Sequence, residues 1–124
     1  MHRQRAGFTL IELLIVVVVT IAIPKFSAMR EKSYIAAVTS DLKNLASQQE
    51  IYLSDYHAYA PTVGDLESIV TDNVVLSVNE ATGTGWAATG THSGLVGAQC
   101  GIYYGAASAS NASPATTPGT VVCD

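Results

Sequence analysis

The sequence predicts an α+β fold, in which one long N-terminal helix packs on a small antiparallel sheet of about three strands. Two patterns support this prediction. A strongly apolar segment near the N-terminus continues into an amphipathic helical pattern, and the second half of the chain alternates short β-rich segments with turn residues. The length of 124 residues limits the chain to one small domain and an apolar anchor.

The apolar segment at residues 8–23 is the first element of the chain. As a helix it would be about 24 Å long, which is short for a hydrocarbon core of about 30 Å. Lys25 can extend the span by snorkelling. Arg3 and Arg5 precede the segment, and basic residues on this side predict a cytoplasmic N-terminus.

Glu12 is the single charged residue of this segment, and a charge inside a membrane helix costs about 2.5–3.5 kcal/mol. No Lys, Arg or His lies between Arg5 and Lys25 to pair with it. Cleavage after Gly7 would create an ammonium group on Phe8, four residues before Glu12 and on the same helical face. An ammonium from a neighbouring copy would make the burial of Glu12 depend on assembly.

Residues 7–13 resemble the processing motif of type IV pilins and pseudopilins. In that family a dedicated aspartic peptidase cuts after the glycine, and the new N-terminal phenylalanine is methylated. The glutamate then pairs with the N-terminal amine of an adjacent subunit in a helical filament. The resemblance implies cleavage after Gly7, methylation of Phe8 and an assembly role for Glu12.

Other interpretations of the N-terminus fit these residues less well. A secretory signal peptide would not carry Glu12 in its apolar region and would end at a small-x-small cleavage site, while a simple anchor leaves Glu12 unexplained. Pro24 should kink the helix, because it removes one hydrogen bond and crowds the preceding turn. Pro24 also comes earlier than in the family pattern, which leaves open a membrane protein that does not assemble.

Residues 25–57 are predicted to continue the helix, because apolar side chains recur at spacings of three and four. The stripe consists of Ile35, Val38, Leu42, Leu45, Gln49, Tyr52 and Tyr56, with Gln49 as its polar break. The opposite, polar side consists of Ser40, Asp41, Lys43, Asn44, Ser47 and Glu50. We expect the stripe to pack on the sheet.

Residues 58–124 form the predicted β-rich domain. Pro61 and Gly64 mark a connecting loop after the helix, and residues 65–70 are expected to add a short turn of helix. The strand candidates, which are rich in β-branched and aromatic residues, are residues 74–79, 86–92 and 99–104.

Cys100 and Cys123 are the two cysteines of the chain. Pilins commonly have a C-terminal loop that is closed by a disulfide and faces the filament exterior, so the resemblance implies that these residues are bonded. Two cysteines in an exported domain agree with this pairing, and two buried free thiols are the alternative. Between them, residues 106–120 have the Ala/Ser/Thr/Pro/Gly composition of a flexible loop.

The charges are unevenly distributed along the chain. Seven acidic residues follow Lys43, whereas no Lys or Arg does, so direct nucleic-acid binding is not expected. Asp65, Glu67 and Asp72 suit a solvated loop better than a calcium site. We expect no metal site, no cofactor and no enzymatic activity.

The sequence therefore predicts four regions: a cytoplasmic leader at residues 1–7, an apolar transmembrane and filament-core helix at 8–24, its amphipathic continuation at 25–57, and the β-rich domain at 58–124. The resemblance implies a single-pass prepilin of the inner (cytoplasmic) membrane that becomes a subunit of an extracellular type IV pilus for motility, adhesion or DNA uptake. Implied partners are further copies of the chain, the prepilin peptidase and methyltransferase, and the assembly platform with its ATPase. A type II secretion pseudopilin and a minor tip pilin with a binding role are the alternatives.

Overall fold

The computed structural model describes the backbone of residues 2–124 and the side chains of residues 29–124. The elements are α1 (His2–Tyr56), η1 (Val63–Asp65), β1 (Val74–Ala81), β2 (Gly85–His92), β3 (Cys100–Gly105), η2 (Ala109–Ala112) and β4 (Val122–Cys123). The chain divides into two compact units, Met1–Lys32 and Ser33–Asp124. Helix α1 is assigned without interruption across Pro24. The side chain of Pro24 lies outside the described residues, so the kink there stays a prediction.

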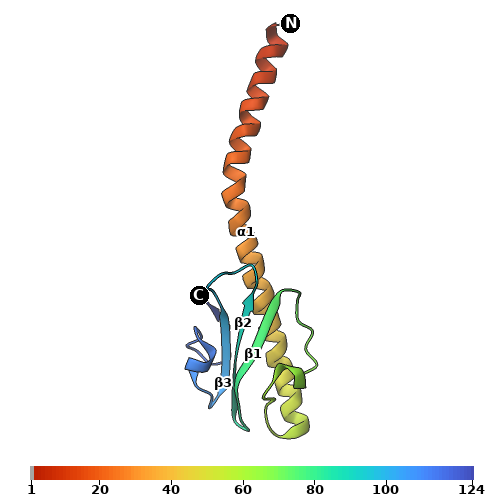
Figure 1. Cartoon of the computed structure of the whole chain (residues 1–124), viewed down its shortest axis with the longest axis vertical. Helices are drawn as coiled ribbons and strands as arrows, with labels where there is room; N and C mark the ends of the chain where they lie inside the picture. The colour runs from red at the N-terminus through yellow and green to blue at the C-terminus, as the bar shows by residue number, and fades with distance from the viewer. Residues whose placement is uncertain (1) are drawn as a thin grey trace. The chain divides into compact units, whose positions relative to one another are not determined.

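The second unit has the predicted α+β architecture, in which the C-terminal part of α1 lies beside an antiparallel sheet (Figure 1). The strands follow the order β1-β2-β3-β4 and therefore form a meander. The first three strands confirm the three candidates, with ends that differ by one or two residues. The fourth strand corrects the predicted number. Strand β4 has two residues, too few for a sequence pattern, and is defined by its pairing with Cys100 and Gly101.

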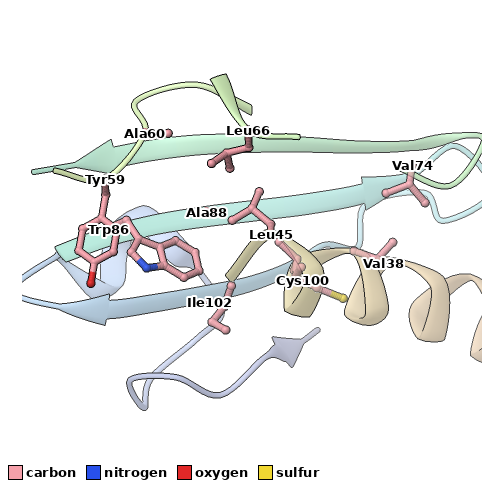
Figure 2. Close-up of a cluster of buried hydrophobic side chains, with 11 residues drawn as sticks. Val38, Leu45, Tyr59, Ala60, Leu66, Val74, Trp86, Ala88, Cys100 and Ile102 are labelled. Atoms are coloured by element: carbon pink, nitrogen blue, oxygen red, sulfur yellow. The ribbon is translucent and has the colours of Figure 1, made fainter. Parts of the chain in front are cut away.

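The face of the sheet toward α1 carries the main hydrophobic core, here called the helix-facing cluster (Figure 2). Its buried members are Val38, Leu42, Leu45, Tyr59, Ala60, Leu66, Val74, Trp86, Ala88, Cys100 and Ile102. The helix approaches β2 closely at Gly90, where an added Cβ would come within 2.8 Å of both Val38 and Leu76. Glycine is needed there because any side chain would push the helix away from the sheet.

The apolar stripe of α1 is confirmed at its centre and wrong at its end. Val38, Leu42 and Leu45 are fully buried, whereas Tyr56 is 66% exposed. The polar break at Gln49 is also fully buried. Its side-chain amide donates a hydrogen bond to the carbonyl of Ala60 at 3.0 Å and accepts one from the Ala60 N–H at 2.8 Å. The Gln49 amide thus satisfies both backbone polar groups of Ala60.

Asp41 was expected on the exposed side of α1, and this expectation is wrong. Its side chain is 4% exposed, and its carboxylate accepts hydrogen bonds from the backbone N–H and the hydroxyl of Thr71, at 2.9 and 3.0 Å. Asp41 thus joins the middle of the helix to the segment before β1. A partner thirty residues away in the chain cannot be inferred from helical periodicity.

Helix α1 ends at Tyr56 because His57 adopts a left-handed conformation, with φ of 59°. The His57 N–H donates to the carbonyl of Leu53, a common way to close a helix. The turn of helix predicted at residues 65–70 is wrong in position. A 3₁₀ turn forms at Val63–Asp65 instead, and residues 66–70 are not helical.

Residues 106–121 cover the other face of the sheet and are ordered, which corrects the expectation of a flexible loop. The buried residues on this side, here called the loop-facing cluster, are Ala87, Tyr103, Ala107, Ala112 and Ala115. Gly101 allows the close approach, since a Cβ there would overlap the carbonyl of Ala112.

Candidate functional site

Three of the predicted functional residues lie near the start of α1. Gly7, Phe8 and Glu12 fall within its backbone, but their side chains lie outside the described residues. Cleavage after Gly7, methylation of Phe8 and the assembly role of Glu12 therefore stay predictions. Among residues 29–124, no helix combines the length and apolar character that a membrane span requires.

The predicted disulfide is present between Cys100 on β3 and Cys123 on β4. Both cysteines belong to the helix-facing side of the sheet, and the Cys123 sulfur lies 3.6 Å from the hydroxyl of Thr39 on α1. Two hydrogen bonds beside the disulfide join the chain end to β3: the Gln99 N–H donates to the Asp124 carboxylate at 2.7 Å, and the Asp124 N–H donates to the Gln99 carbonyl at 3.1 Å. The cysteines thus close the loop at residues 106–121 against the sheet.

Polar side chains of β1 and β3 form hydrogen bonds with residues 108–116 of the same loop. Glu80 accepts hydrogen bonds from the Ser108 N–H at 3.0 Å and from the Asn111 side chain at 2.8 Å. These two bonds, the Ser108 bond first, hold the pKa of Glu80 below its usual value. The Tyr103 hydroxyl donates to the Thr116 carbonyl at 3.0 Å. The loop is therefore anchored along its length.

A groove near the C-terminal end of α1 was not predicted from the sequence. It has a volume of about 150 Å³, and we call it the acidic groove. Its lining residues are Gln48, Ile51, Tyr52, Asp55, Tyr56, Asp65, Leu66 and Glu67. The acidic lining residues Asp55, Asp65 and Glu67 come from two segments, α1 and the loop after it that contains η1, so the groove forms only on folding. Within residues 29–124, no group of three or more His, Cys, Asp or Glu residues is arranged to hold a metal ion.

The wall of the acidic groove includes an aromatic pair. The rings of Tyr52 and Tyr56 lie 4.4 Å apart between centroids and are tilted by 31°. Ile51 is 56% exposed beside them. The spacing of these residues on the helix was visible in the sequence, but it indicated a core position for Tyr56 and gave no sign of a groove.

Glu50, one residue before Ile51, does not line the acidic groove and instead bonds to the connecting loop. It accepts a hydrogen bond from the hydroxyl of buried Tyr59 at 3.2 Å. Burial, and then the negative charge of Glu50, raise the pKa of Tyr59 to about 12. Tyr59 therefore remains a neutral donor at physiological pH and fixes the start of the loop on α1.

Comparison with known proteins identifies the N-terminal segment. The family model described as the prokaryotic N-terminal methylation motif matches residues 2–22. The chain is 32% identical over 74 residues to the type II secretion system core protein G of Pseudomonas aeruginosa, in an alignment of 56% of this chain and 52% of that protein. It thus spans about half the length of this relative.

A second relative is matched over more of its length. The chain is 32% identical over 101 residues to the type IV wide pilus major component PilA4 of Thermus thermophilus, in an alignment of 74% of this chain and 77% of that protein. Both relatives are named as components of larger assemblies, and neither name describes an enzyme. With its long helix, its antiparallel sheet and its N-terminal methylation motif, the chain belongs to the type IV pilin and pseudopilin family.

Proposed function

We propose that the chain is the pilin subunit of a type IV pilus, cleaved between Gly7 and Phe8, methylated on Phe8 and polymerised into a helical surface filament. The observation that carries the proposal is the N-terminal methylation motif over residues 2–22, which includes Gly7, Phe8 and Glu12. The similarity to a pilus major component over 77% of its length supports a pilus role.

The chemistry of the N-terminus explains how such a filament is held together. In the filament the apolar residues 8–23 of neighbouring copies bury one another, so the segment leaves the lipid without exposing apolar surface to water. Glu12 is neutralised there by the Phe8 ammonium of an adjacent copy. An unpaired carboxylate in this core would be costly, so the pair sets the register between copies. The domain at residues 58–124 remains outside the apolar core.

The similarity to a type II secretion core protein favours a second candidate, a pseudopilin of a secretion system. Mass spectrometry of filaments sheared from cells distinguishes the two functions. The pilus proposal predicts an abundant protein that begins at Phe8, with one added methyl group and two hydrogens fewer for the disulfide. A mature chain found only in the cell envelope would favour the pseudopilin, and an uncleaved chain would contradict both.

The variant Glu12→Ala tests the pairing role. Alanine removes the cost of leaving Glu12 in lipid, so the mature subunit should stay in the membrane, and filament yield should fall about tenfold or more, equivalent to about 1.4 kcal/mol per subunit. Asp72→Ala, which removes an exposed acid outside the N-terminal segment and the acidic groove, serves as the control. Cleavage should be unaffected in both variants, and equal filament yields would contradict the role of Glu12.

A further inference from the structure

We propose that the acidic groove receives the basic stretch of α1, residues 25–43, from a second copy of this chain. The inference rests on the proposed function, because it describes how copies meet in the filament. It concerns a contact outside the apolar N-terminal segment and uses different residues from the pair of Phe8 and Glu12.

The first argument is charge complementarity. Asp55, Asp65 and Glu67 line the groove, and the sequence contains no Lys or Arg after Lys43 that could neutralise them. Once the leader is removed, every remaining Lys and Arg lies in one stretch of α1. These residues are Lys25, Arg30, Lys32 and Lys43. The basic residues and the acidic residues of the groove thus belong to different segments of the sequence.

The second argument is the separation of Lys43 from Asp55 within one chain. Lys43 is the basic residue nearest to the groove in sequence, and it precedes Asp55 by twelve positions on the same helix. That separation is about 18 Å along the helix axis, whereas an ion pair needs about 4 Å between nitrogen and oxygen. Lys43 of the same chain therefore cannot pair with Asp55, and a second copy is a partner that filament assembly supplies.

The third argument is the shape and lining of the groove. Tyr56 is 66% exposed and Ile51 is 56% exposed, so the groove combines acidic residues with exposed apolar and aromatic side chains. A lysine or arginine side chain has an apolar stem and a charged end, and it can lie along such a surface while its charge meets a carboxylate. The exposed ring of Tyr56 can also attract the cation directly.

The geometry of this contact agrees with a filament. The groove and the basic stretch are different surfaces, so a contact between them is heterologous and leaves each copy with one surface free. Repeated heterologous contacts that do not close into a ring generate helical filaments. Because the contact is electrostatic and lies at the surface, it should weaken as salt concentration rises.

Charge reversal in the full-length protein tests the proposal. Asp55→Lys combined with Glu67→Lys should lower the yield of sheared filaments about tenfold or more. Asp72→Lys, at an exposed acid that does not line the groove, is the matched control and should assemble like the wild type. Adding Lys32→Glu and Lys43→Glu to the groove variant should restore most of the yield. The groove is then basic and the stretch of α1 is acidic, so the two surfaces again have opposite charges. Fluorescence of Trp86, the only tryptophan, checks that each variant is folded.

A crosslinking measurement tests whether residues 25–43 of a second copy lie in the acidic groove, and it does not depend on the folding of the charge variants. A photoreactive phenylalanine in place of Ile51 should crosslink to residues 25–43 of another copy in wild-type filaments. Crosslinks to other residues, or equal yields of the groove variant and Asp72→Lys, would overturn the inference while leaving the proposed function intact. A wild-type chain that forms no filaments would instead overturn the proposed function and this inference with it.

Discussion

On the side of the sheet that faces α1, large apolar side chains are buried, whereas on the side that faces residues 106–121 most of the buried side chains are alanines. Trp86, Leu42 and Leu45 are among the largest fully buried residues of the first side. On the second side, Tyr103 is the one large member of the loop-facing cluster, at least among the residues that the structure describes. The two sides of one sheet are therefore stabilised by different means.

The helix-facing cluster depends mainly on the hydrophobic effect, because a buried leucine or tryptophan removes much apolar surface from water. Alanine buries little surface, so the loop-facing side needs other interactions. These are the close backbone contact at Gly101, the hydrogen bonds of Glu80 and Tyr103, and the disulfide that closes the loop. We expect the first side to be sensitive to side-chain volume and the second to be sensitive to covalent and polar changes.

Leu42→Ala should have the largest effect on stability. Leu42 is fully buried between α1 and the sheet, and its truncation leaves a cavity that should cost about 2–5 kcal/mol of unfolding free energy. The buried Trp86 in the same cluster reports this transition by fluorescence during denaturant unfolding of the detergent-solubilised protein. The exposed position Asn44→Ala on the same helix provides the control, with a change of about 0.5 kcal/mol or less. Similar values for the two variants would refute a volume-dependent core.

Removal of the disulfide should have the next largest effect. The bond joins residues separated by 23 positions, and the loss of this constraint on the unfolded chain should cost about 3 kcal/mol. Cys100→Ser should also make residues 106–121 sensitive to protease while Trp86 remains buried, and it should lower filament yield. The double variant Cys100→Ser with Cys123→Ser controls for the free thiol that the single variant leaves. Unchanged melting and protease resistance in both variants would show that the loop does not depend on the bond.

Glu80→Gln should have the smallest effect, and it should depend on pH. The hydrogen bonds from Ser108 and Asn111 lower the pKa of Glu80 in the folded protein below its ordinary value of 4.5. A lowered carboxyl pKa stabilises the fold above the unfolded pKa, and this contribution is lost as pH falls through the lower, folded-state value. In the wild type, amide exchange of residues 108–112 should therefore become faster relative to the unfolded chain below about pH 4.5. Glu80→Gln should show a flatter pH profile, and parallel profiles for the two proteins would refute the role of the carboxylate.

The α1 residues of the helix-facing cluster could be predicted from the sequence, whereas the loop-facing cluster could not. Periodicity identified Val38, Leu42 and Leu45 as core, and β-branched and aromatic residues identified three strands, because both patterns depend on neighbours along the chain. The loop-facing cluster carries no such pattern. Alanine, serine and threonine have the composition of a flexible segment, and only contact with the sheet shows that Ala107, Ala112 and Ala115 are buried.

The functional residues divide in the same way. Roles for Gly7, Phe8 and Glu12 could be predicted from the sequence, because a peptidase motif and an unpaired charge in an apolar segment are local properties. The acidic groove could not, because Asp55 and Glu67 come from separate segments that meet only after the chain turns at His57. Charge counts indicated an acidic domain without showing which acidic residues line a groove.

The family, the N-terminal motif, the long helix and its central apolar stripe could all be predicted from the sequence, since each is encoded within a short stretch of neighbouring residues. Only the tertiary structure decided that Asp41 and Gln49 are buried, that β4 pairs with β3, and that Tyr56 borders a groove instead of the core. The physical reason is that a polar or small side chain is buried when distant groups supply its hydrogen bonds or cover its surface. Thr71, Ala60 and the backbone at Gly101 supply them here, and no local pattern reveals such partners.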